Sequence, residues 1–79
     1  MFTPQEKNLI PRLFQDKKMK EIANDMGLSE KTVDMFQRSL LKKLGLNTRV
    51  GLIVAYYTDI SVADKLMNLI EKIPLTKES

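Results

Sequence analysis

The chain has 79 residues, 43% of them hydrophobic and 29% charged, which limits it to one small globular domain. It contains no Cys and no His, so disulfides, the common zinc sites and catalysis through a histidine base are excluded. The net charge of +3 permits a polyanionic partner, and so small a core favours support from a partner subunit.

The first predicted helix begins at Thr3, with Pro4 in the first helical position and Glu6 closing a capping box. Apolar residues then recur at helical spacing: Leu9, Ile10, Leu13 and Phe14. Pro11 lies inside this segment and removes one backbone hydrogen bond. We therefore expect a helix that is kinked or shortened at Pro11.

The second predicted helix runs from about residue 18 to 26 and the third from about residue 30 to 44. Gly27 and Gly45 are suited to end these helices, because glycine adopts a positive φ at low cost. Ser29 is a good N-cap for the third helix. The two helices are thus joined by a tight, glycine-containing turn.

The third predicted helix has two distinct faces. Its inner face carries Val33, Phe36, Leu40 and Leu44. Its outer face carries Lys31, Asp34, Met35, Arg38 and Lys42. Residues 29–49 hold five basic and two acidic residues, a net charge of +3, so the basic excess of the chain lies around this helix.

A fourth helix is predicted over about residues 49–57, capped by Asn47 or Thr48. It is apolar on two sides: Val50, Ile53, Val54 and Tyr57 form one face, and Leu52, Ala55 and Tyr56 form the other. A buried strand would fit the composition, but a lone strand has no partner here. A helix that is apolar on two sides is expected to be fully buried or to pair with another chain.

A fifth, amphipathic helix is predicted from Ser61, which with Asp64 resembles a capping box, to the residue before Pro74. Its apolar stripe consists of Val62, Leu66, Leu69, Ile70 and Ile73. We favour a role for this stripe in a dimer, because the core of one chain is thin. The alternative is that the helix packs back on its own domain as a lid.

Two helices joined by a tight turn, the second with a basic outer face, are typical of a helix-turn-helix, which places that face in the major groove of DNA. Five blocks also match a known family in order and spacing: Thr3-Pro4-Gln5-Glu6, Lys20-Glu21-Ile22-Ala23, Leu28-Ser29-Glu30-Lys31-Thr32-Val33, Lys43-Leu44-Gly45-Leu46 and Thr48-Arg49. Over about residues 2–57 the chain resembles the DNA-binding domain of the LuxR/FixJ/GerE family of transcription regulators. Its small size resembles that of standalone, GerE-like members.

The resemblance implies a role for each matching position. Base-reading positions fall on Asp34, Met35 and Arg38. Phosphate-binding positions fall on Lys31, Thr32, Lys42, Lys43 and Arg49. Asp34 departs from the family, which commonly has Lys there, and a carboxylate in a phosphate-rich groove is unfavourable. It could accept from a cytosine amino group or pair with Arg38, four residues on.

The family also implies a dimer formed through the fourth helix. We expect the dimer interface to include Leu52, Ala55, Tyr56, Leu66 and Ile70. We further expect a DNA-binding domain over residues 1–57 and a helical extension over residues 58–79. The predicted fold is therefore all-α, a four-helix helix-turn-helix bundle with a fifth C-terminal helix.

The chain is predicted to be a cytoplasmic, homodimeric transcription regulator that binds double-stranded DNA sequence-specifically. Its expected target is an inverted repeat. We expect no enzymatic activity, no cofactor and no metal, because catalytic pairs and a glycine-rich phosphate loop are missing from the sequence. The alternative is an anti-regulator that binds another regulator through its fourth and fifth helices instead of binding DNA. The modest net charge and Asp34 favour this alternative.

Overall fold

A computed structural model describes residues 2–69, which form five α-helices and contain no strand. The helices are α1 (Pro4–Leu13), α2 (Met19–Met26), α3 (Glu30–Lys43), α4 (Arg49–Thr58) and α5 (Ile60–Leu69). The predicted all-α fold is thus confirmed, and so is the choice of a helix over a strand for residues 49–57. None of the helices in the described part is long and apolar enough to cross a membrane.

The local signals of the sequence account for the beginnings of α1, α3 and α4. Thr3 and Glu6 form the predicted capping box, with the Thr3 N–H donating to Glu6 Oε1 at 2.9 Å. Ser29 Oγ accepts from the Thr32 N–H at 3.1 Å, and Thr48 Oγ1 accepts from the Gly51 N–H at 2.9 Å. α1 continues through Pro11 and ends two residues later, at Leu13.

The turn between α2 and α3 has the predicted geometry. Gly27 ends α2 in the left-handed conformation, with φ of 68°, and Gly45 follows α3 with φ of 75°. Three residues, 27–29, separate the two helices. α2, this turn and α3 therefore form a helix-turn-helix.

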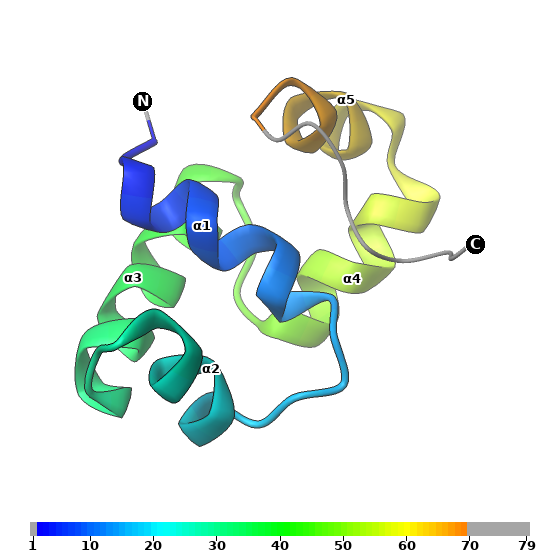
Figure 1. Cartoon of the computed structure of the whole chain (residues 1–79). Coiled ribbons are helices and arrows are strands. Elements are labelled where there is room, and N and C mark those ends of the chain that lie inside the picture. Colours follow the sequence, from blue (N-terminus) through cyan, green and yellow to red (C-terminus); the bar gives the residue numbers. More distant parts are fainter. Residues whose placement is uncertain (1, 70–79) are drawn as a thin grey trace.

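The helices share one hydrophobic core. α1 and α2 pack against α3, and α5 packs against α4, as Figure 1 shows. The core consists of Leu9, Ile10, Leu13, Ile22, Ala23, Val33, Leu40, Leu41, Leu44, Leu52, Val62 and Leu66. Phe36, expected on the inner face of α3, is only partly buried against this cluster, whereas Leu41 is buried in it.

The fifth helix begins differently from the prediction. It starts at Ile60, and Asp59 Oδ1 accepts hydrogen bonds from the Ser61 N–H at 3.0 Å and from Ser61 Oγ at 2.8 Å. Asp59, not Ser61, is therefore the capping side chain, because its carboxylate reaches the free N–H groups of the first turn.

Within one chain, α5 packs back on the domain. Val62 and Leu66 join the same core as the other helices. The expected division at residue 57 stays a prediction, although the core is continuous across it. Ile70 and Ile73, expected in the apolar stripe, lie outside the described residues.

Candidate nucleic-acid interface

The outer face of α3 is the largest grouping of predicted site residues on one surface. Lys31, Met35, Arg38 and Lys42 are exposed, and Asp34 is half-buried beside them. The four exposed residues follow one another at intervals of four, three and four positions, so they lie along one side of the helix. The inner face of the same helix is held in the core by Val33 and Leu40. α3 can therefore present these side chains as a rigid stripe.

Asp34 and Arg38 form an ion pair on this stripe. Arg38 Nε lies 2.9 Å from Asp34 Oδ2, one helical turn away. The side chain of Arg38 remains 80% exposed and that of Asp34 40% exposed. Of the two predicted possibilities for Asp34, the structure contains the pairing with Arg38.

Thr32, predicted to bind phosphate, takes part in the cap of α3. Its Oγ1 lies 2.9 Å from Ser29 Oγ, and its N–H donates to the same oxygen. The side chain thus belongs to the hydrogen bonds that begin the helix. Its predicted contact with phosphate remains untested.

Lys43, another predicted phosphate contact, lies at the end of α3 beside the start of α1. Its Nζ donates to Glu6 Oε1 at 2.7 Å and lies 5.4 Å from the centre of the Phe2 ring. Glu6 is only 2% exposed, and burial alone would raise its pKa. Hydrogen bonds from the side chains of Lys43 and Ser39 and from the Thr3 backbone lower that pKa to about 2. Lys43 is therefore the counter-ion of a buried carboxylate.

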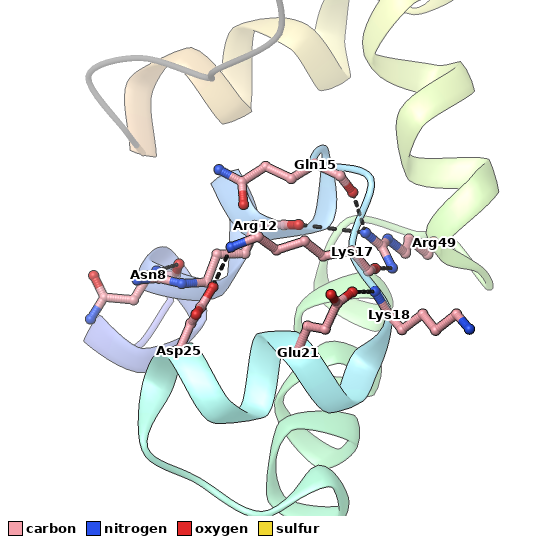
Figure 2. A network of polar contacts seen from close by, with 8 residues as sticks. All are labelled: Asn8, Arg12, Gln15, Lys17, Lys18, Glu21, Asp25 and Arg49. Carbon is pink, nitrogen blue, oxygen red and sulfur yellow. Dashed lines mark hydrogen bonds and ion pairs between the residues drawn. The ribbon is translucent and has the colours of Figure 1, made fainter.

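Arg49, the last predicted phosphate contact, binds backbone carbonyl groups where α1 ends. Its Nε donates to Leu13 O at 2.8 Å, and its Nη1 donates to Lys17 O at 2.7 Å. Nη2 donates to Gln15 O at 2.7 Å and more weakly to Arg12 O at 3.5 Å. Figure 2 shows the Arg49 guanidinium beside the carbonyls of Arg12, Gln15 and Lys17. Most of its five N–H donors are thus used within the chain.

The predicted dimer residues of α4 and α5 lie largely inside the monomer. Leu52 and Leu66 are fully buried, and Ala55 and Tyr56 are partly buried against the core. A fully buried side chain offers no surface to a second chain, so Leu52 and Leu66 cannot form an interface in this structure. Ile70 lies outside the described residues.

The exposed apolar side chains of α4 are on its other face. Val50 is 69% exposed, Val54 53% and Tyr57 64%. They are spaced by four and three residues and so form one stripe, which we call the α4 stripe. Two further apolar side chains are exposed on α5: Ile60 is 83% and Met67 61% exposed.

Comparison with known sequences settles the family. The profile of the bacterial regulatory proteins of the luxR family matches residues 1–56. The chain belongs to this family. This is a family of bacterial transcription regulators and not of enzymes.

Two curated relatives carry the same type of domain. The transcriptional regulatory protein MctR of Rhizobium johnstonii is 33% identical over 64 residues, 81% of this chain and 29% of MctR. The transcriptional regulatory protein UhpA of Salmonella typhimurium is 42% identical over 50 residues, 63% of this chain and 26% of UhpA. The luxR-type chain therefore spans under a third of each relative. No solved structure matches it significantly.

Sequence reasoning missed the internal roles of Lys43 and Arg49. Their partners, Glu6 and the carbonyls of residues 12–17, lie 32 or more positions away along the chain. A local hint for the burial of Glu6 is its helical spacing from Leu9 and Ile10, three and four residues on, which lie in the core. Nothing near Arg49 in the sequence indicates its carbonyl partners.

Proposed function

We propose that the chain is a sequence-specific, double-stranded DNA-binding transcription regulator that acts as a homodimer. The observation that carries this proposal is the outer face of α3, where Lys31, Arg38 and Lys42 are exposed on the second helix of a helix-turn-helix. Such a face fits the major groove, and its cations complement the phosphates on either side. A regulator of this kind would act in the cytoplasm, where bacterial DNA lies.

Within this proposal the exposed residues divide into two groups. Met35 and Arg38 would contact bases, with Arg38 donating to guanine as the strongest single contact and Met35 packing on a thymine methyl group. Asp34 would take part in base reading through its ion pair with Arg38. Lys31, Thr32 and Lys42 would hold phosphates and set the register. Lys43 and Arg49, which bind groups of their own chain, would contribute mainly long-range positive charge.

The proposal is tested by selection from a random pool of duplex DNA at moderate salt. Enrichment of an inverted repeat is expected, because two copies of α3 related by a two-fold axis read the same half-site in opposite directions. A pool that stays random would contradict the proposed function.

Replacing Arg38 by Ala is expected to remove one base preference. The lost bidentate contact should cost about 1–3 kcal/mol on the selected site and little on DNA that lacks the preferred base. Repeating the selection with the variant measures this directly. An unchanged binding profile would contradict the assignment of Arg38.

Replacing Lys42 by Ala is expected to weaken binding to all sequences alike. Loss of one phosphate contact should reduce the slope of log K against log salt by about 0.9. Binding measured at several salt concentrations, on the selected site and on unrelated DNA, gives both quantities. A changed sequence preference with an unchanged slope would show that Lys42 reads a base.

The α4 stripe is the surface that we propose for the dimer. It is the exposed apolar side of a helix with no charged residue between Val50 and Thr58. Burying uncharged apolar side chains against a second copy removes them from water at no cost in unpaired charge. This places the proposed interface on the face of α4 opposite to Leu52.

Replacing Val54 by Glu is expected to weaken the dimer at least about tenfold, because a carboxylate would be buried without a partner. Asn68→Glu is the matched control, since it adds the same charge at an exposed polar position of α5. Sedimentation equilibrium of the two variants and the unaltered chain gives the association constants. Equal association of both variants would exclude this stripe from the interface.

The structure also favours one alternative, an anti-regulator that docks on another regulator. Asp34 neutralises Arg38, and Lys43 and Arg49 are used internally, which leaves Lys31 and Lys42 as the exposed cations of this region without an ion pair among the described residues. A salt titration separates the two functions. DNA binding weakens steeply with salt, whereas apolar docking does not.

A further inference from the structure

The Asp34–Arg38 pair sits at the centre of the proposed groove face. Arg38 Nε lies 2.9 Å from Asp34 Oδ2, and this is the interaction that the structure gives the Arg38 guanidinium among the described residues. The contact uses Nε, so the terminal nitrogens Nη1 and Nη2 keep their four N–H donors. With the side chain 80% exposed, these donors are accessible from outside the helix.

Guanine recognition requires two donors held side by side. O6 and N7 of guanine accept a bidentate pair of N–H groups in the major groove. One N–H group of Nη1 and one of Nη2 can provide such a pair while Nε remains bound to the carboxylate. An arginine without the carboxylate would sample many rotamers and would reach neighbouring phosphates as readily as the base.

We propose, on the basis of the proposed DNA-binding function, that Asp34 is a positioning residue that holds Arg38 for guanine and withholds its charge from phosphates. Asp34 acts through Arg38 and does not itself read a base. The carboxylate lowers the general attraction of this face to DNA and raises its discrimination between base pairs.

The charges on the outer face of α3 support this exchange of general attraction to DNA for discrimination between base pairs. The exposed cations of the face are Lys31, Arg38 and Lys42, and Asp34 is the acidic residue among them. Paired at 2.9 Å, it cancels most of the field of Arg38 at a distance, where non-specific attraction arises. In water the exposed pair is weak, but displacement of water from the groove strengthens it.

The test compares Asp34→Asn with Glu30→Gln in the full chain. Both substitutions remove one negative charge from α3, but Glu30 is exposed and has no ion pair among the described residues. The base pair read by Arg38 is first found as the position lost when Arg38→Ala is put through the selection. Dissociation constants are then measured for duplexes with and without that guanine, and circular dichroism verifies that each variant is folded.

Asp34→Asn is expected to reduce discrimination at this base pair at least about threefold, a part of the roughly 5- to 150-fold that one bidentate contact provides. Binding to unrelated DNA should tighten, and its salt slope should steepen by up to about 0.9. Glu30→Gln should tighten non-specific binding but keep the discrimination. Asp34→Glu should keep part of the discrimination that Asp34→Asn loses, since glutamate also pairs with an arginine four residues on.

Two results would overturn the proposal. One is unchanged discrimination in Asp34→Asn. The other is a change made by Asp34→Asn in the Arg38→Ala background, which would mean that Asp34 reads a base independently. If the unaltered chain enriches no sequence at all, the proposed function fails and this inference falls with it, which is a different outcome from enrichment that Asp34→Asn leaves intact.

Discussion

Replacing Arg49 by Ala is expected to lower the free energy of unfolding by about 3 kcal/mol. Its guanidinium donates to the carbonyl oxygens of Leu13, Gln15 and Lys17 at 2.7–2.8 Å. The Leu13 carbonyl is the last of α1 and has no partner within the helix, and a hydrogen bond from a charged donor contributes about 1.5–3 kcal/mol. The expected loss is less than the sum, because water can reach part of this surface.

So large a loss would threaten the fold of a domain this small. A chain of 79 residues is expected to have a total stability of only about 4–12 kcal/mol. Arg49 also joins the start of α4 to the end of α1 and to the connection that leads into α2. DNA binding is therefore expected to fall in Arg49→Ala through loss of folded protein.

Urea unfolding followed by circular dichroism measures the effect. Arg12→Ala is the matched control, since Arg12 also donates to a backbone carbonyl, Asn8 O at 2.7 Å, but within its own helix at an exposed site. We expect a change of about 0.5 kcal/mol there. Equal unfolding midpoints for the two variants would mean that the carbonyl contacts of Arg49 contribute nothing.

Arg49→Lys separates the structural role from the phosphate role that the family resemblance implies. Lysine keeps the charge but cannot place several donors in the fixed fork of a guanidinium. We expect it to lose most of the stability that Arg49→Ala loses. If Lys kept full stability and Ala lost only DNA affinity, the phosphate role would be correct.

Acidification is expected to remove about 2 kcal/mol of stability through Glu6. Its folded-state pKa is about 2, below the ordinary value of 4.5, so the unfolded chain binds more protons in between. The stabilisation is fully present above about pH 5 and is lost as the pH falls through about 2. The figure is smaller than the whole pKa difference would give, because the Lys43 side chain is 33% exposed.

Glu6→Gln should abolish this part of the pH dependence. At neutral pH the variant leaves Lys43 beside a buried amide, so it should be less stable than the unaltered chain, and the difference should shrink towards about pH 2. Urea unfolding across this range measures both. A difference that stays constant with pH would contradict the assignment of the pKa to Glu6.

Glu21→Gln is the control for a carboxylate that caps a helix at the surface. Glu21 Oε1 accepts from the Lys18 N–H at 2.9 Å and is exposed.

Some pH dependence should remain in every variant. The Lys17 side chain lowers the pKa of Asp25, and hydrogen bonds from Ser61 lower the pKa of Asp59.

Much of the fold followed from signals that act over a few residues. The capping box at Thr3 and the caps at Ser29 and Thr48 could be predicted, because the capping oxygen and the N–H that donates to it lie three positions apart. The exception was α5, where Ser61 and Asp59 both offer an oxygen to the first turn. Which of them caps depends on how α4 ends.

The outer face of α3 was also readable, because helical periodicity separates it from the inner face. Lys31, Arg38 and Lys42 are exposed, as the pattern predicted. The pairing of Asp34 with Arg38 was one of two open possibilities, since a spacing of four permits contact but does not require it.

Local sequence determined the helices, their caps and the exposed stripe of α3, because these depend on neighbours within one or two turns. Tertiary packing determined which apolar face of α4 turned inward and what Lys43 and Arg49 bind. Leu52 faces the core and Val54 faces out because α3 and α5 pack against the side of α4 that carries Leu52. Lys43 meets Glu6, and Arg49 meets the carbonyls at the end of α1, only when segments more than 30 residues apart pack together.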